Sequence, residues 1–162
     1  MGIHLYRIDD RLIHGQVVVG WGQPLNVRFL VLVDDLVASS EWEKDLYRMA
    51  VPPEMEICFA DVDAAIRDHA RYASDPRPGI LITGDIESML RLVKGVKAIG
   101  SVNLGGIHHR AGRDEKLRYV FLTPDEEQQL RALEASGVEV TAQDVPSARA
   151  RSLAEVLEGE SK

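Results

Sequence analysis

The segment from Arg7 to Val17, RIDDRLIHGQV, brings together the side-chain types that phosphoryl chemistry uses. An imidazole, here that of His14, is a good nucleophile toward phosphorus, and its reference pKa of about 6.5 leaves much of it neutral near pH 7. Arg11 can hold phosphoryl oxygens through two parallel hydrogen bonds. Asp9 or Asp10 can accept a hydrogen bond that orients Arg11 or selects the imidazole tautomer. The alternative is an Asp/Arg turn that carries a structural histidine.

Glycines occur at two places where a backbone could approach an anion closely. Gly15 removes a side chain beside the candidate imidazole, so backbone amides or a second protein can come near. A later loop contains Asn103, Gly105 and Gly106, and paired glycines allow backbone amides to gather around an anion. Between residues 91 and 118, seven Lys or Arg and two Asp or Glu give a local charge of 7 − 2 = +5. We therefore expect these four residues to bind phosphate, although a Gly-Gly loop is also an ordinary turn.

The remaining histidines are weaker candidates for chemistry. His4 falls in an expected strand and His69 in an amphipathic helix, so both are interpreted as structural or exposed. His108 and His109 are adjacent, which points them apart and does not suit one metal ion. They follow the glycine loop closely enough to approach a bound phosphate, with an exposed loop as the alternative.

Two further strand ends carry polar residues. Thr83 or Gly84 could line the same crevice, and helix capping is the expected role of Asp85. Asp34 and Asp35 follow a continuous apolar run, where solvated turn residues are the default and partner docking is the alternative.

Apolar patterns typical of strands and of helices alternate along the whole chain. Strands are expected at 3–8, 29–33, 55–59, 80–82, around 98–99 and at 138–141, and helices at 13–21, 40–50, 62–69, 86–93, 123–135 and around 153–157. In the helix at 40–50, Trp42, Leu46 and Met49 have the spacing of an apolar face. The alternation predicts the α/β class: a single-domain, open, doubly wound, mostly parallel sheet with helices on both faces. Ligands in such folds bind at the carboxyl ends of strands.

Length and composition limit the functional classes. The 162 residues suit one domain, expected at 1–158, with a disordered tail at 159–162. The net charge of −7 argues against binding nucleic acid or an anionic membrane. A single cysteine, Cys58, excludes an internal disulfide and a cysteine zinc cluster, and we expect it in the core. No stretch is typical of a signal peptide or a membrane helix, so we expect a cytoplasmic protein without direct membrane insertion.

The run RIDDRLIHGQV resembles the active-site signature of the IIB component of the mannose/fructose/sorbose family of the bacterial sugar phosphotransferase system (PTS). The family's later patterns are also present in order: Asn-x-Gly-Gly at 103–106, a Thr-Pro-led acidic helix at 123–127, Gly-Val-x-Val at 137–140, and Val145-Pro146. The resemblance therefore spans nearly the whole chain, and its first motif is highly specific.

This resemblance implies a phosphotransferase. His14 would accept a phosphoryl group from a phosphohistidine on a separate IIA component and pass it to a sugar held by the membrane components IIC and IID. Arg11 would be the phosphate clamp and Asp10 the orienting carboxylate. No cofactor and no metal are implied, because the imidazole itself is the carrier. The protein would be cytoplasmic and peripherally associated with the transporter, and a homo-oligomer stays open.

Two other functions remain as alternatives. A chain of this kind could be phosphorylated on His14 and regulate a partner without any part in transport. Histidine phosphatases also place a histidine and a glycine after their first strand, in the order Arg-His-Gly. Here Ile13 occupies the position of that arginine, which removes a main phosphate ligand.

Overall fold

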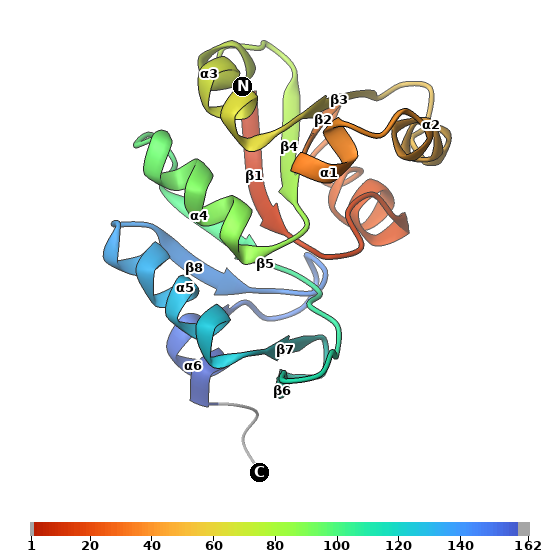
Figure 1. Ribbon diagram of the computed structural model, residues 1–162. Helices are drawn as coiled ribbons and strands as arrows, with labels where there is room; N and C mark the ends of the chain where they lie inside the picture. Colours follow the sequence, from red (N-terminus) through yellow and green to blue (C-terminus); the bar gives the residue numbers. More distant parts are fainter. Residues whose placement is uncertain (1, 159–162) are drawn as a thin grey trace.

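The structure, a computed structural model, describes residues 2–158 and contains one large sheet and one hairpin (Figure 1). The strands are β1 (Gly2–Ile8), β2 (Phe29–Val33), β3 (Glu56–Ala60), β4 (Pro78–Thr83), β5 (Ser101–Leu104), β6 (Asp114–Leu117), β7 (Val120–Leu122), β8 (Glu139–Ala142) and β9 (Arg151–Ser152). The helices are η1, a π-helix (Gln16–Trp21), α1 (Asp35–Ala38), α2 (Glu41–Ala50), α3 (Val62–Ala73), α4 (Ile86–Gly95), α5 (Pro124–Ala135) and α6 (Leu153–Glu158). The predicted disordered tail, 159–162, lies outside the described residues.

The seven-stranded sheet has the order β3-β2-β4-β1-β5-β8-β9, and only β9 runs antiparallel to its neighbour. The predicted α/β class with a mostly parallel sheet is therefore confirmed. β1 lies between β4 and β5, so the chain builds the sheet outward on both sides of its first strand. The carboxyl end of β1 is consequently the switch point, where folds of this class bind ligands.

Apolar side chains cover both faces of the sheet, because strand residues alternate between the faces. In β2, Leu30 and Leu32 pack with η1 and α1, whereas Val31 and Val33 pack with the face that carries α3 to α6. Figure 1 shows α3, α4, α5 and α6 on one side of the sheet and α1 and α2 on the other. Helices on both faces are thus confirmed. No helix among residues 2–158 is long and apolar enough to cross a membrane.

Helix starts follow the capping residues of the sequence. The side chains of Ser40, Asp61 and Asp85 accept hydrogen bonds from the first turns of α2, α3 and α4. At α5, Thr123 and Glu126 bond reciprocally, with the Glu126 amide 3.1 Å from Thr123 Oγ1 and the Thr123 amide 2.9 Å from Glu126 Oε1. Each cap satisfies amides that have no partner inside the helix.

Several element predictions were wrong. No strand occurs around 98–99: Lys97 and Ala98 form a turn, and the strand β5 begins at Ser101. The β6–β7 hairpin was not predicted, because the sequence DEKL of β6 is too polar to show a strand pattern. The short helix α1 was also missed, and Asp34, interpreted as a solvated turn residue, is its N-cap.

Candidate active site

Arg7 is a buried cation at the centre of the sheet. It pairs in register with Ile82 of β4 and Asn103 of β5, and it has no exposed surface. Its guanidinium donates to Asp9 Oδ2 at 3.1 Å, to Asn103 Oδ1, and to the carbonyl oxygens of Gln143 at 2.9 Å and Asp144 at 3.1 Å. Burial lowers the pKa of Arg7 and the Asp9 carboxylate opposes that change. A guanidinium starts so far above pH 7 that it stays charged.

Asp9 connects Arg7 to the loop that follows β1. Its carboxylate has no exposed surface and accepts a hydrogen bond from Arg7 Nη2 at 3.1 Å. It also accepts from three donors of Arg11, the backbone amide, Nε and Nη2, each at 3.1 Å. His14 Nε2 lies 3.4 Å from Asp9 Oδ2. Burial alone would raise the pKa of Asp9, but hydrogen bonds from His14 and Arg11 and the charges of both arginines hold it below its ordinary value. One buried carboxylate therefore orients both the imidazole and the exposed arginine.

The His14 side chain is 17% exposed and lies at the carboxyl edge of the sheet. Its position is set by the loop: the Leu12 amide donates to the Asp9 carbonyl at 3.0 Å, and Leu12 and Ile13 are buried. Leu12 has a φ of 58°, a conformation that strains a residue with a branched side chain. Burial of two apolar side chains holds that strained turn in place, so His14 is directed toward Asp9 rather than into the core.

The contacts with Arg11 and His14 that were expected of the orienting carboxylate, predicted as Asp10, are made in the structure by Asp9. Asp10 turns the other way: its Oδ1 accepts from His108 Nδ1 at 2.6 Å and its Oδ2 from the His108 amide at 2.8 Å. The His108 carbonyl in turn accepts from Arg113, which forms a two-bond ion pair with Glu126 at the start of α5. Asp10 therefore ties the glycine loop to the His14 loop.

The residues expected to bind phosphate have different surroundings. Asn103 is buried and accepts from Arg7, and the Gly105 amide donates to the Ile8 carbonyl at 2.6 Å. Gly106 lies beside the Arg11 guanidinium, and nothing lies within 4 Å of the position that a Gly15 side chain would occupy. Gly15 is therefore exposed beside open space, whereas Gly106 is buried against Arg11 and Asp9, and Asn103 and Gly105 are buried against Arg7.

We predict that Gly105→Ala destabilises the protein by about 2 kcal/mol, within the range for overpacking a filled site. An added Cβ would lie 2.3 Å from Arg7 Nη2 and 2.7 Å from Asp9 Oδ2, and Arg7 is too tightly held to retreat. Urea denaturation measures this change. Gly100→Ala is the matched control, because its Cβ would meet nothing within 4 Å; equal stability of the two variants would contradict the crowding argument.

The cationic stretch at 91–118 does not form one patch in the structure. Arg91 contacts Asp35 at 2.9 Å, Arg113 contacts Glu126 at 2.7 Å and Lys116 contacts Glu127 at 3.3 Å. Acidic residues outside the counted range therefore pair with three of its seven cations, and the local attraction of an anion stays a prediction. Arg11 is the partly exposed cation beside His14.

The other candidates take structural positions. Thr83 is buried and donates to the Asp85 carbonyl, and Asp85 caps α4 as predicted.

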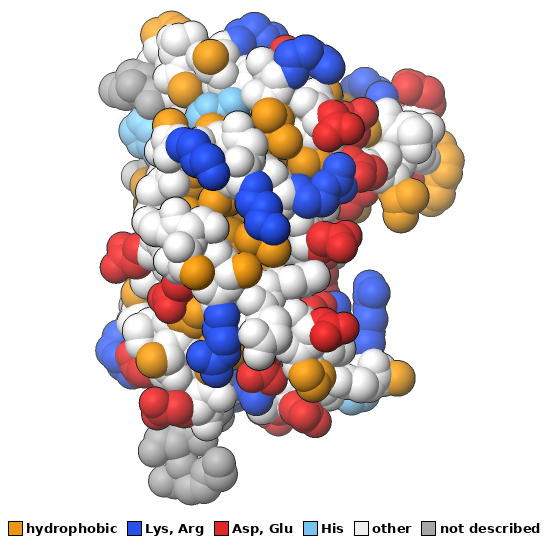
Figure 2. Space-filling view, turned by 60° about the vertical axis from the view of Figure 1, so that its left-hand side comes forward, with side chains coloured by type: hydrophobic (Ala, Val, Ile, Leu, Met, Phe, Trp, Pro, Cys, Tyr) orange, Lys and Arg blue, Asp and Glu red, His pale blue; other side chains and the backbone are white. Residues whose placement is uncertain are grey.

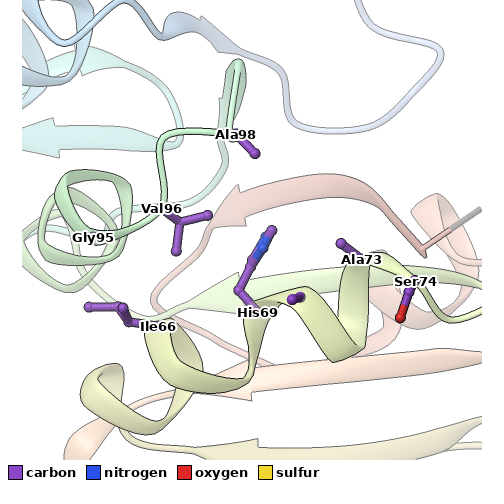
Figure 3. Close-up of a pocket in the computed structure, with 8 residues that line it drawn as sticks. Ile66, His69, Ala73, Ser74, Gly95, Val96 and Ala98 are labelled. Atoms are coloured by element: carbon purple, nitrogen blue, oxygen red, sulfur yellow. The ribbon is translucent and has the colours of Figure 1, made fainter.

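His69 Nε2 lies 2.7 Å from the Tyr6 hydroxyl, and burial raises the pKa of Tyr6 to about 12. His69 also borders an apolar hollow of ≈ 500 Å³ between α3 and the segment after α4 (Figure 3). Gly2, the first residue of β1, packs against Ala73 at the end of α3. The hollow therefore lies at the amino end of β1, whereas His14 follows its carboxyl end.

Sequence reasoning missed the contributions of Arg7, Trp21 and the segment after β8. The Trp21 ring lies 5.0 Å from the Arg7 guanidinium carbon, and its Nε1 donates to the Asp144 carbonyl at 3.1 Å. A backbone carbonyl has no signature in a sequence, so the role of Gln143 and Asp144 could not be found there. Over residues 2–158, no group of three or more His, Cys, Asp or Glu side chains could hold a metal ion.

The fold and site together define an α/β protein that presents an imidazole, backed by a buried carboxylate and two arginines, at its switch point. The model of a family described as "PTS system sorbose subfamily IIB component" matches residues 3–162. The chain belongs to this family, the IIB components of the mannose/fructose/sorbose type, phosphotransferases that transfer a phosphoryl group in sugar uptake.

Individual relatives agree with the family match. The sorbose-specific EIIB component of Klebsiella pneumoniae is 32% identical over 148 residues, which is 91% of this chain and 90% of that protein. The mannose-specific EIIAB component of Escherichia coli K12 is 36% identical over 149 residues, 90% of this chain but 45% of the relative. The crystal structure of manxB from Thermoanaerobacter tengcongensis superimposes with a TM-score of 0.87 at 32% identity, covering 96% of this chain and 95% of that one.

Proposed function

We propose that the chain carries the phosphoryl group on His14, accepts it from a IIA component and transfers it to a sugar bound by the membrane components IIC and IID. The observation that carries this proposal is the contact of His14 Nε2 with the buried Asp9 at 3.4 Å, at the open carboxyl end of β1. The relative named EIIAB supports a IIA-type donor. The protein then works in the cytoplasm, peripherally attached to its transporter.

The contact of His14 with Asp9 supports a choice between the two ring nitrogens. A carboxylate 3.4 Å from Nε2 favours the proton on that nitrogen, so the nucleophilic lone pair is on Nδ1. Nδ1 attacks the donor phosphorus, and the bond from phosphorus to the donor imidazole breaks. Asp9 stabilises the positive charge that the phosphorylated ring of His14 acquires. In the second step a sugar hydroxyl attacks phosphorus, loses its proton to a base on the acceptor side, and the Nδ1–phosphorus bond breaks.

Arg11 stabilises the transferring group. Its Nε and Nη2 already contact Asp9, so phosphoryl oxygens meet Nη1 and the outer side of Nη2. Asp9 therefore holds the guanidinium in place before the phosphoryl group arrives, which avoids reorganisation during the reaction. Gly15, which is exposed with open space at its Cβ position, leaves room for the partner protein.

The test is a transfer assay with phosphoenolpyruvate, the general phosphotransferase proteins and a cognate IIA. We expect an acid-labile, base-stable phosphoprotein whose NMR couplings place phosphorus on Nδ1. Adding membranes that contain IIC and IID should move the label to sugar. A stable label that never reaches sugar would favour the regulatory alternative, and a label on Nε2 would contradict the proposed role of Asp9.

We predict that Arg11→Lys slows phosphoryl transfer from IIA on the order of 10- to 100-fold and leaves folding intact. A lysine supplies the charge but cannot contact Asp9 and the phosphoryl oxygens with the same planar fork. Rapid-quench kinetics measure the rate, and thermal unfolding checks the fold. An unchanged rate would remove Arg11 from the mechanism.

A further inference from the structure

The helix α2 presents its apolar side chains to solvent. None of its residues is buried, and Trp42, Leu46 and Met49, together with Leu36 of α1, are between 53% and 82% exposed. The spacing in the sequence predicted that Trp42, Leu46 and Met49 share a face, and in the structure this face points to solvent. We call these four residues the α1–α2 surface. Several apolar side chains on one face of a helix indicate a site of interaction, whereas isolated ones are ordinary.

The side of α2 that faces the rest of the protein carries long polar side chains. The Arg48 guanidinium carbon lies 5.2 Å from the centre of the Phe59 ring, and the Lys44 side chain is 18% exposed. Tyr47 is half-buried, and burial raises its pKa. The orientation of α2 is therefore fixed by contacts on its polar side, and the outward position of the apolar stripe is a property of the fold.

The α1–α2 surface lies at the same edge of the sheet as His14. Both α1 and the His14 loop follow carboxyl ends of parallel strands, β2 and β1. A side chain at Gly84 would lie 3.2 Å from Leu12 of the His14 loop and 3.3 Å from Asp34, the N-cap of α1, so the two segments meet there. In Figure 2 hydrophobic side chains occupy the outer edge of the α1–α2 lobe, at the upper right of the view.

The border of this surface is acidic. Glu41 and Asp45 are 80% and 70% exposed on one flank of the stripe, and Asp35 is half-exposed beside Leu36. Lys44 and Arg48 pair with Glu41 and Asp45, and Arg91 pairs with Asp35 at 2.9 Å. The border nevertheless stays acidic, because residues 34–50 contain five Asp or Glu and two Lys or Arg, a net charge of 2 − 5 = −3. A second copy of the chain would bring a like-charged border, and an anionic lipid surface would also be repelled. The complementary partner is apolar with a basic border.

We propose that the α1–α2 surface docks the cytoplasmic face of the membrane-embedded acceptor. Cytoplasmic segments of membrane proteins carry an excess of Lys and Arg, which matches the acidic border, and their apolar side chains would cover Trp42 and Met49. This inference rests on the proposed function, because the acceptor must also reach the phosphoryl group on His14. Docking beside His14, rather than over it, leaves the ring itself accessible to the IIA donor.

Two double variants with the same change of charge test this proposal. Glu41→Lys with Asp45→Lys reverses the border of the α1–α2 surface, and Glu134→Lys with Glu139→Lys makes the same change at exposed positions of α5 and β8. A third variant, Trp42→Ser with Met49→Ser, removes apolar area. Because all six side chains are exposed, we expect every variant to fold.

Each protein is assayed in three ways: labelling by phosphoramidate, a small phosphoryl donor, labelling by phosphorylated IIA, and transfer to sugar by vesicles containing IIC and IID. For the two α1–α2 variants we expect the KM for the phosphorylated chain in the vesicle assay to rise at least about tenfold, as for loss of a central contact. Both labelling rates should stay within about twofold of wild type, and the control variant should behave as wild type throughout.

The proposal is overturned if the vesicle KM is unchanged, if labelling by IIA falls in parallel, or if the wild-type chain sediments equally well with protein-free vesicles. An unchanged vesicle KM would mean that the acceptor does not use the α1–α2 surface. A parallel fall in labelling by IIA would mean that the donor binds there, and sedimentation with protein-free vesicles would mean that the surface binds lipid. A wild-type chain that takes no label from IIA or phosphoramidate would instead refute the carrier function, and the docking inference would fall with it.

Discussion

Asp9→Asn is expected to destabilise the protein by about 3–5 kcal/mol and to remove most phosphoryl transfer, as found when one partner of a buried ion pair is deleted. Asp9 has no exposed surface and is the carboxylate shared by Arg7, Arg11 and His14. An asparagine keeps the shape, but it cannot balance the buried charge of Arg7. Its amide also cannot accept from all of these donors, so the imidazole loses its orientation.

Asp10→Asn is the matched control for this experiment. Asp10 is also an aspartate, but its carboxylate is partly exposed and accepts hydrogen bonds from the His108 ring and amide. We expect a cost of about 1 kcal/mol, typical of one lost hydrogen bond. Urea denaturation of both variants measures the difference. Equal losses would show that Asp9 has no special place in the site.

The same carboxylate should make stability depend on pH in acid. The folded-state pKa of Asp9 is held below its unfolded value of about 3.9, so its contribution is fully present above that pH and is lost as the pH falls. Denaturation of the wild type and of Asp9→Asn from pH 7 to pH 2 should therefore show a difference in unfolding free energy that shrinks below about pH 4. A difference that grows in acid would contradict the direction of the pKa change.

Much of the fold could be predicted because its signals are local. The continuous apolar run 29–33 indicates a strand covered on both faces, and the Thr123 to Glu126 capping box marks the start of α5. The strand at 101–104 was not recognised, because its Asn103 serves a buried arginine of β1 rather than an apolar core. A polar residue such as Asn103 interrupts the apolar pattern by which a strand is recognised in the sequence. The strand itself is not destabilised, because the polar group has a buried partner.

The site could be predicted in its composition but not in its pairings. His14 and Arg11 stand in one motif, and the loop does bring them to a common carboxylate. Whether that carboxylate is Asp9 or Asp10 depends on which way each side chain points after β1 ends, and two adjacent aspartates in a loop give no signal for this. The partners of Arg7 include carbonyls more than a hundred residues away, which only the three-dimensional fold brings together.

The outward face of α2 is the clearest case in which a sequence pattern was misleading. A spacing of four and three describes which residues share a face, but it does not state where that face points. In this protein Arg48 and Tyr47 anchor the other side, and Trp42 and Met49 remain in solvent. Such a disagreement between pattern and burial is what identified the α1–α2 surface.

The carrier function is tested most directly by phosphorylating His14→Gln and wild type in parallel with phosphoenolpyruvate, the general phosphotransferase proteins and IIA. We predict a complete loss of acid-labile label in His14→Gln, because an amide offers no nucleophilic ring nitrogen. His108→Gln should label normally, since that ring is held by Asp10 on the glycine loop. Label retained on His14→Gln, or lost only from His108→Gln, would contradict the account.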